Sequence, residues 1–348
     1  MSTLWTDYIT PAELTGYARG YLSDYEASKG TLARWLPNRE VADIVARFVA
    51  GQTGLIDVAD FRAYDAEPGI GSLPGGKRVT LELPAIGKQF PVSEYNQLRQ
   101  RSIATEDEVR KFILDTTKLV VRSVADGMER MRGIVISTGR ATISNVDGFT
   151  MDDGFGRSAG HDLVAGTLWD SATSVSRLTY LQTIIDTYTD DNGEAPGAIV
   201  TSTKVLRVIA QGDEFSNQLV NGASRPATTA DVNAILDAND FPPITVFDRR
   251  VKVAGSTTRV LPQNKLFLLP AAVDPTDWEG TELGATFWGQ TLSSSEPGWE
   301  IEPSEQPGIV VGTYRNEKPP MIAEVIPDAI GLPVLANADL SLAAQVIT

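Results

Sequence analysis

The chain of 348 residues is long enough to bury a large core and to divide into two or three lobes. It carries 45 Asp and Glu against 30 Lys and Arg, and the resulting net charge of −15 argues against a surface built to bind DNA or RNA. The absence of cysteine excludes disulfides, thiolate metal sites and cysteine nucleophiles, and neither a secretory signal nor an apolar run of membrane-spanning length is visible.

The first predicted element is a helix that begins after Thr10. Thr10 can cap this helix, Pro11 suits the first helical position, and Glu13 completes a capping box. Apolar and aromatic residues then recur at helical spacing, at Leu14, Tyr17, Tyr21 and Tyr25. Gly16 and Gly20 lower the helix propensity, so the helix needs a partner surface. Two interpretations stay open: the helix packs on its own domain, or it is an arm whose tyrosines lie on a neighbouring subunit.

A long hairpin is predicted next. A second helix is expected over residues 39–50, and residues 55–64 then look like a strand. The Gly/Pro-rich stretch EPGIGSLPGGK follows at residues 67–77, and after it Val79, Leu81 and Leu83 alternate with polar residues, which indicates a half-exposed strand. Because isolated hairpins are only marginally stable in water, we expect contacts outside its own lobe to stabilise this hairpin.

The tip of this hairpin contains a near-match to a nucleotide-binding motif. Gly71, Gly76 and Lys77 have the spacing of the P-loop G-x-x-x-x-G-K-[ST]. In that motif a Ser or Thr hydroxyl binds magnesium and a helix N-terminus faces the phosphates. Here Arg78 replaces the hydroxyl residue and a strand follows, so both features are missing. A P-loop-like nucleotide-binding enzyme is therefore only the weaker alternative to a hairpin tip.

The longest predicted helix begins at Thr105, which forms a capping box with Glu108. Its apolar face is traced by Val109, Phe112, Ile113, Thr116, Val120, Val124, Met128, Met131 and Val135. About 30 residues with a rise of about 1.5 Å each give a rod about 45 Å long. Arg130 and Arg132 are expected near its C-terminal end, where the helix dipole favours cations.

Beyond this helix the elements are short and mixed. Residues 140–155 indicate short strands and turns, and a compact region begins near Leu163. We expect helices over 173–188, 203–210 and 228–238, strands over 244–253 and 266–269, and a β-rich C-terminal segment. Helices and strands alternate without a regular βαβ period, which predicts an α+β fold rather than a doubly wound sheet.

No catalytic or metal-binding site is predicted. His161 is the only histidine, which excludes zinc motifs with two histidines, and we interpret it as a polar loop residue. The acidic turns at Asp152 and Asp153 and at residues 186–194 lack a complete set of calcium ligands. We therefore expect neither a cofactor nor a resident metal.

Five stretches of the chain carry a resemblance to a known family. They are TPAEL in the first helix, DFRAYDAEPGIGSLPGGKRVTLELP in the hairpin, ATEDEVRKFILDTTKLVVRSVADGMERM in the long helix, ITVFDRRVKVAG with LPQNKLFLLPA further on, and PPMIAEVIPDAIGLPVLANADLSLAAQVI at the end. In this order they resemble the major capsid proteins of tailed double-stranded DNA phages, and the lambda-like capsid protein family in particular.

The resemblance implies the Hong Kong 97-type capsid fold, divided into five parts. These are an N-terminal arm (1–52), an extended loop hairpin (53–98), a peripheral domain with the spine helix (99–160), an axial domain (161–305), and return strands to the peripheral domain (306–348). It also implies a structural subunit and not an enzyme. Such subunits self-assemble as hexamers and pentamers into the icosahedral shell that encloses packaged double-stranded DNA.

The resemblance also suggests where the subunits touch. Assembly contacts are expected at the extended loop tip, at Gly71, Pro74, Gly75, Gly76, Lys77 and Arg78, and on the arm, at Tyr17, Tyr21 and Tyr25. Because the chain lacks the N-terminal extension that some members use as a built-in scaffold, a separate scaffolding protein is implied.

The other implied partners are a portal protein, a decoration protein and packaged DNA without sequence-specific contact, with no membrane. The expected location is the virion, after assembly in the host bacterial cytoplasm. An encapsulin-type nanocompartment shell and another phage structural subunit, such as a tail component, remain open as alternatives.

Overall fold

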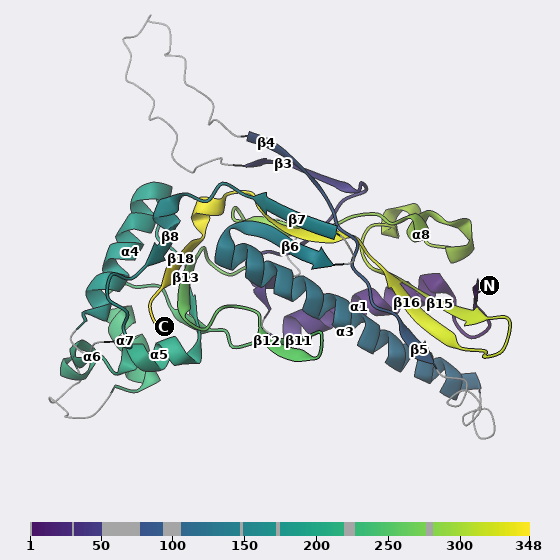
Figure 1. Ribbon diagram of the computed structural model, residues 1–348, viewed down its shortest axis with the longest axis horizontal. Coiled ribbons are helices and arrows are strands. Elements are labelled where there is room, and N and C mark those ends of the chain that lie inside the picture. The colour runs from purple at the N-terminus through teal and green to yellow at the C-terminus, as the bar shows by residue number, and fades with distance from the viewer. Residues whose placement is uncertain are drawn as a thin grey trace, which may run out of the picture.

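The computed structural model describes residues 2–29, 31–50, 77–92, 106–146, 149–171, 175–218, 227–275 and 281–348. None of the helices in these ranges is both long and apolar enough to cross a lipid bilayer. Figure 1 shows an elongated molecule, with the N-terminus towards one end and a helical lobe that holds the C-terminus towards the other.

Helix α3 (Glu106–Thr138) is the spine of the molecule and runs along much of its length (Figure 1). Its buried residues enter two hydrophobic clusters. Val120, Val124 and Met128 pack in a cluster near the N-terminal helix, whereas Val135 and Ile136 belong to the main core. The predicted long apolar helix is confirmed, although its expected cap, Thr105, lies outside the described residues.

Helix α1 (Pro11–Lys29) packs against α3 and against strand β15 (Val310–Asn316). Thr10 Oγ1 accepts a hydrogen bond from the Glu13 amide at 3.3 Å, as the expected cap requires. Leu14, Ala18 and Leu22 are buried in the contact. The low helix propensity of Gly16 and Gly20 requires a partner surface, and α3 and β15 of the same chain provide it.

Two small sheets lie beside α3. One is antiparallel, in the order β1 (Ser2–Leu4), β15, β16 (Ala323–Asp328) and β5 (Phe90–Val92). The other has the order β17 (Gly331–Leu335), β14 (Gly284–Trp288) and β2 (Asn38–Glu40), with β2 parallel to β14. Both sheets join strands from the two ends of the chain, so the N-terminal and C-terminal segments fold together.

The lobe with the C-terminus is built on a five-stranded mixed sheet. Its strand order is β10 (Ile244–Val246), β9 (Ala198–Thr201), β13 (Lys265–Leu269), β18 (Leu342–Gln345) and β8 (Asp162–Val164). Its helices are α4 (Arg177–Asn192), α5 (Thr203–Ala210), α6 (Asp213–Asn217) and α7 (Thr229–Ala238).

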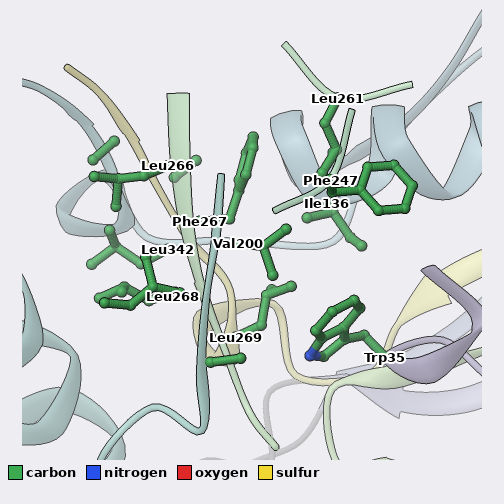
Figure 2. Close-up of a cluster of buried hydrophobic side chains, with 14 of the residues drawn as sticks. Trp35, Ile136, Val200, Phe247, Leu261, Leu266, Phe267, Leu268, Leu269 and Leu342 are labelled. Atoms are coloured by element: carbon green, nitrogen blue, oxygen red, sulfur yellow. The ribbon is translucent and has the colours of Figure 1, made fainter. Parts of the chain in front are cut away.

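The main core connects this lobe to the spine. Figure 2 shows Val200 and Leu266–Leu269 from the central strands, together with Ile136 from α3 and Trp35. Trp35 is 2% exposed, and its indole nitrogen donates to the Pro270 carbonyl at 3.0 Å. Because one continuous cluster spans both parts, the lobe is fixed to the spine by packing and not by a linker alone.

Three two-stranded hairpins complete the sheets of the described part of the chain. They are β3 (Val45–Ala50) with β4 (Lys77–Glu82), β6 (Arg140–Val146) with β7 (Phe149–Gly154), and β11 (Arg250–Val253) with β12 (Ser256–Arg259). The remaining short helices of the described residues are α8 (Leu292–Ser295) and the 3-10 turns Leu32–Arg34, Ala159–His161, Pro297–Trp299, Pro303–Glu305 and Ala338–Leu340.

The α+β class and most elements agree with the sequence, with two corrections. The helix predicted over residues 39–50 is wrong, since β2 and β3 occupy this stretch. Six residue pairs with β4 fix β3 as a strand, and this pairing overrides a helix-like spacing of apolar residues. The single strand predicted over 244–253 is two strands in different sheets, because β10 joins β9 and β11 turns back on β12.

Two helical glycines provide a matched test of packing. A Cβ on Gly133 of α3 would lie 2.3 Å from the Val260 carbonyl oxygen, whereas one on Gly20 of α1 would meet nothing within 4 Å. Gly20→Ala should therefore raise the free energy of unfolding by about 0.5–1 kcal/mol through helix propensity. Gly133→Ala should lower it by about 1–3 kcal/mol through overpacking. Urea unfolding of free subunits measures both, and a stabilised Gly133→Ala variant would show that α3 does not pack this closely.

Candidate assembly surfaces

The hairpin of β3 and β4 is anchored at one end and extends away from the body at the other (Figure 1). The two strands pair from Val45 with Glu82 to Ala50 with Lys77. Near the first of these pairs, Ala46, Leu81 and Leu83 are buried in the main core. Among the described residues β3 and β4 pair only with each other, so both outer edges are open for another strand or surface.

The predicted loop tip lies mostly outside the described residues. Gly71, Pro74, Gly75 and Gly76 are not described, whereas Lys77 and Arg78 are the first two residues of β4. A strand therefore follows the lysine directly, as the sequence predicted. Because a strand and not a helix begins at Lys77, the helix dipole that faces the phosphates in a P-loop is missing.

The three arm tyrosines lie on α1 and are partly buried. Tyr21 and Tyr25 stack with ring centroids 6.2 Å apart and pack against the cluster shared with α3. The Tyr25 hydroxyl lies 3.1 Å from Asp126 Oδ1 of α3. Of the two interpretations, packing on the helix's own domain is therefore observed. A contact of Tyr17, Tyr21 or Tyr25 with a neighbouring subunit stays a prediction.

A buried ionic cluster fixes α1 against the spine. Arg132 of α3 is fully buried, and its Nη1 donates to Glu26 Oε1 of α1 at 2.7 Å and to Glu129 Oε2 at 3.3 Å. Its Nη2 donates to Asn38 Oδ1 of β2 at 2.6 Å, and its Nε donates to Thr286 Oγ1 of β14 at 2.9 Å. One guanidinium thus connects four elements.

The partners of Arg132 are themselves held in place. Asn38 Nδ2 donates to Glu26 Oε2 at 2.5 Å, and the Trp288 indole donates to Asn38 Oδ1 at 2.8 Å. Burial by itself lowers the pKa of Arg132, but the carboxylates of Glu26 and Glu129 outweigh it, so the pKa is raised. Arg132 therefore keeps its positive charge at every pH at which the protein is folded. Burial raises the pKa of Glu129, and the charges of Arg132 and Arg249 oppose this effect.

Two expectations about charged residues need correction here. Arg132 was expected to serve the C-terminal dipole of the long helix, but α3 continues to Thr138 and Arg132 is used internally. His161 was interpreted as a polar loop residue, but it is fully buried, with Nε2 2.9 Å from Asp191 Oδ2 and its ring stacked on Tyr188.

No group of acidic or histidine side chains arranged to hold a metal occurs in the described part of the chain.

Comparison with known proteins identifies the family. The family model described as phage major capsid protein E matches residues 28–279, which is more than half of the chain. The chain belongs to the phage major capsid protein E family. It is a structural subunit of the phage shell and not an enzyme, and its location is the virion. The resemblance drawn from the sequence is confirmed.

Solved structures support the Hong Kong 97-type fold of this capsid protein. One match is a crystal structure described as that of a prophage capsid protein from E. coli CFT073, with 13% identity, coverage of 98% of this chain and 99% of that chain, and a TM-score of 0.65. Another is a phage-related protein from Bordetella bronchiseptica RB50, with 15% identity, 95% coverage of each chain and a TM-score of 0.60. At these identities the likeness shows the fold alone. No curated protein matches the sequence.

The Arg132 cluster of this capsid protein was not found from the sequence. The spacing of Glu129 and Arg132 is that of an i, i+3 pair on one helix, which was a usable signal. Glu26, Asn38 and Thr286 carry no such signal, because they lie on three other elements. Only the fold brings them to the guanidinium.

Removal of this guanidinium should destabilise the capsid subunit. Arg132→Met leaves Glu26 buried without its cation and leaves Glu129 with Arg249 alone, at 3.5 Å, so the free energy of unfolding should fall by about 3–5 kcal/mol. Arg130→Met is the matched control, because Arg130 lies two residues away on the same helix but is exposed, and it should change stability by less than about 0.5 kcal/mol. Equal effects of both variants in denaturant unfolding would refute a structural role for the cluster.

Proposed function

We propose that this capsid protein assembles as hexamers and pentamers into a closed icosahedral phage head that encloses packaged double-stranded DNA. The observation that carries the proposal is the hairpin of β3 and β4. Its base is fixed in the core by Ala46, Leu81 and Leu83, while its two strands pair with no other strand among the described residues. A two-stranded ribbon is marginal in water, so the outer part of this hairpin gains stability from a neighbouring subunit.

Closed shells follow from such contacts when each subunit repeats them. A contact between two different surfaces of identical subunits is heterologous, and it generates a ring if the rotation closes. The anchored base matters for this purpose, because it fixes the direction in which the hairpin leaves the body. Six-fold and five-fold rings of the same subunit then build the faces and vertices of the shell.

The proposed contacts and parts follow the resemblance. The extended loop tip, from Gly71 to Arg78, and the arm tyrosines are proposed to touch neighbouring subunits. The arm is assigned to residues 1–52, the loop to 53–98, the spine region to 99–160, the axial domain to 161–305 and the return strands to 306–348. All three tyrosines are partly exposed, so each can present part of its ring to a neighbouring subunit.

Further partners are proposed from the needs of assembly. A scaffolding protein would direct shell closure, a portal protein would occupy one vertex, and a decoration protein would bind the finished surface. DNA inside the shell would make no sequence-specific contact, because a chain with a net charge of −15 repels phosphates overall. Electron microscopy of purified particles tests the shell and its contents together, since an encapsulin-type particle would enclose proteins and no genome.

Deletion of Gly71–Gly76 tests the role of the loop. The free subunit should keep its thermal unfolding midpoint, because every buried core residue of the described part remains and loop closure depends only weakly on length. Assembly with scaffold should fail or give aberrant shells, because the missing contact recurs in every copy. Normal shells from this deletion variant, seen by electron microscopy, would contradict the proposal.

Limited proteolysis provides an independent check on the intact protein. Trypsin should cut at Lys77 or Arg78 readily in free subunits and slowly in mature shells, because a neighbouring subunit covers the loop only after assembly. Cleavage at the same rate in both states would mean that the loop makes no assembly contact.

A further inference from the structure

A groove lies along one side of the spine helix. It has a volume of about 960 Å³ and is bounded by α3, by residues 84–90, and by the hairpins β6–β7 and β11–β12. A second hollow of about 580 Å³, between the end of α1 and residues 245–250, shares Arg122 with it. The two hollows therefore adjoin at Arg122, and we call them together the basic groove.

The basic groove is strongly cationic. Its exposed cations come from five segments of the chain and are Lys29, Arg34, Lys88, Arg122, Arg130, Arg250 and Lys252. None of them forms an ion pair with another described residue. The two lining acids are already neutralised, since Asp126 pairs with Arg249 at 2.7 Å and Asp248 pairs with Arg259. In a chain with a net charge of −15, seven uncompensated cations on one surface mark a site for an anionic partner.

The floor of the groove is apolar. Leu119 and Phe149 line the larger hollow with exposed fractions of 50% and 47%, and Val246 lines the smaller one with 43%. These are three of the six large apolar side chains that are strongly exposed in the described part of the molecule. Such clustering is typical of a surface that another polypeptide covers.

The junction of the two hollows is rigid. Arg122 and Arg249 both stack on the Tyr25 ring, with guanidinium carbons 5.7 and 5.3 Å from the ring centroid. The Tyr25 hydroxyl and Arg249 Nη2 both contact Asp126 Oδ1. A partner therefore meets a preformed site and loses little affinity to the ordering of these side chains.

We propose that the basic groove binds an acidic, amphipathic segment of a protein other than this chain. Carboxylates of the segment pair with the cationic rim, and its apolar side chains cover Leu119 and Phe149. A nucleic-acid backbone would neutralise the cations but leave the apolar floor in water. The described part of a second copy fits less well, because outside the groove its exposed apolar residues, Ile44, Val164 and Leu292, lie singly on separate segments.

The proposal goes beyond shell formation and is tested on free subunits, so its failure is separate from a failure of assembly. The probe is a labelled synthetic peptide of about 20 residues with Leu at helical i, i+3, i+4 spacing and Glu elsewhere. Fluorescence anisotropy should show saturable binding. Leu119→Ala and the double variant Arg122→Glu/Arg250→Glu should each weaken it about tenfold or more.

The matched control is the double variant Lys111→Glu/Lys318→Glu. It makes the same change in net charge at two exposed lysines that do not line the groove, and it should bind the peptide as the unmodified protein does. Unchanged thermal unfolding midpoints will show that all variants are folded. An equal loss of binding in the control, or no saturable binding up to about 1 mM peptide, would overturn the proposal.

Two further probes test whether the groove binds polyanions in general or another copy of this chain. If a peptide with Ser in place of Leu, or a DNA duplex of about 20 base pairs, binds as tightly and is insensitive to Leu119→Ala, the groove is a general polyanion site. If a peptide of residues 51–76 of this chain binds more tightly than the Glu/Leu peptide and displaces it, the groove is a contact between copies. Either result refutes an acidic segment of another protein as the occupant.

Discussion

A guanidinium without water must be surrounded by acceptors, and this requirement at Arg132 sets the relation between the main parts of the protein. Isolated burial of a charge is so costly that the chain must bring carboxylates and further acceptors to it. Those acceptors come from α1, β2 and β14, which are distant in sequence from one another. The same geometry that satisfies the arginine therefore places the N-terminal helix along the spine and the three-stranded sheet across it.

A rigid body of this kind allows other elements to extend from it. The hairpin of β3 and β4 is embedded in the main core at its base, so its direction is fixed even though its edges are unpaired in the described residues. A shell needs this combination, because a contact repeated around a ring closes only if every subunit presents it at the same angle. Stability is concentrated in the spine and lobe, and the proposed intersubunit contact of the hairpin lies beyond them.

The charges of the chain are distributed unevenly, and this has consequences for its partners. The acidic excess keeps a concentrated shell protein soluble and limits its adhesion to DNA. The basic groove is the local exception. Its two acids form ion pairs with Arg249 and Arg259, and its exposed cations form no ion pair with described residues. A surface that opposes the net charge of its own protein selects its partners by charge as well as by shape.

The sequence alone determined the elements with strong local signals. The apolar period of the spine helix and the alternation in β4 are properties of neighbouring residues, and both were predicted correctly. The order of these elements then sufficed for the family. The loop tip and arm contacts rest on that order too, and they remain predictions.

Tertiary structure decided what depends on residues far apart in the chain. Residues 45–50 have apolar spacing that suits a helix, but pairing with β4 makes them a strand. His161 was interpreted as a polar loop residue, but it is buried and stacks on Tyr188. The Arg132 cluster and the basic groove have no local signature either, because each is assembled from several elements. Local periodicity depends on adjacent residues, whereas burial and charge neutralisation depend on the folded chain.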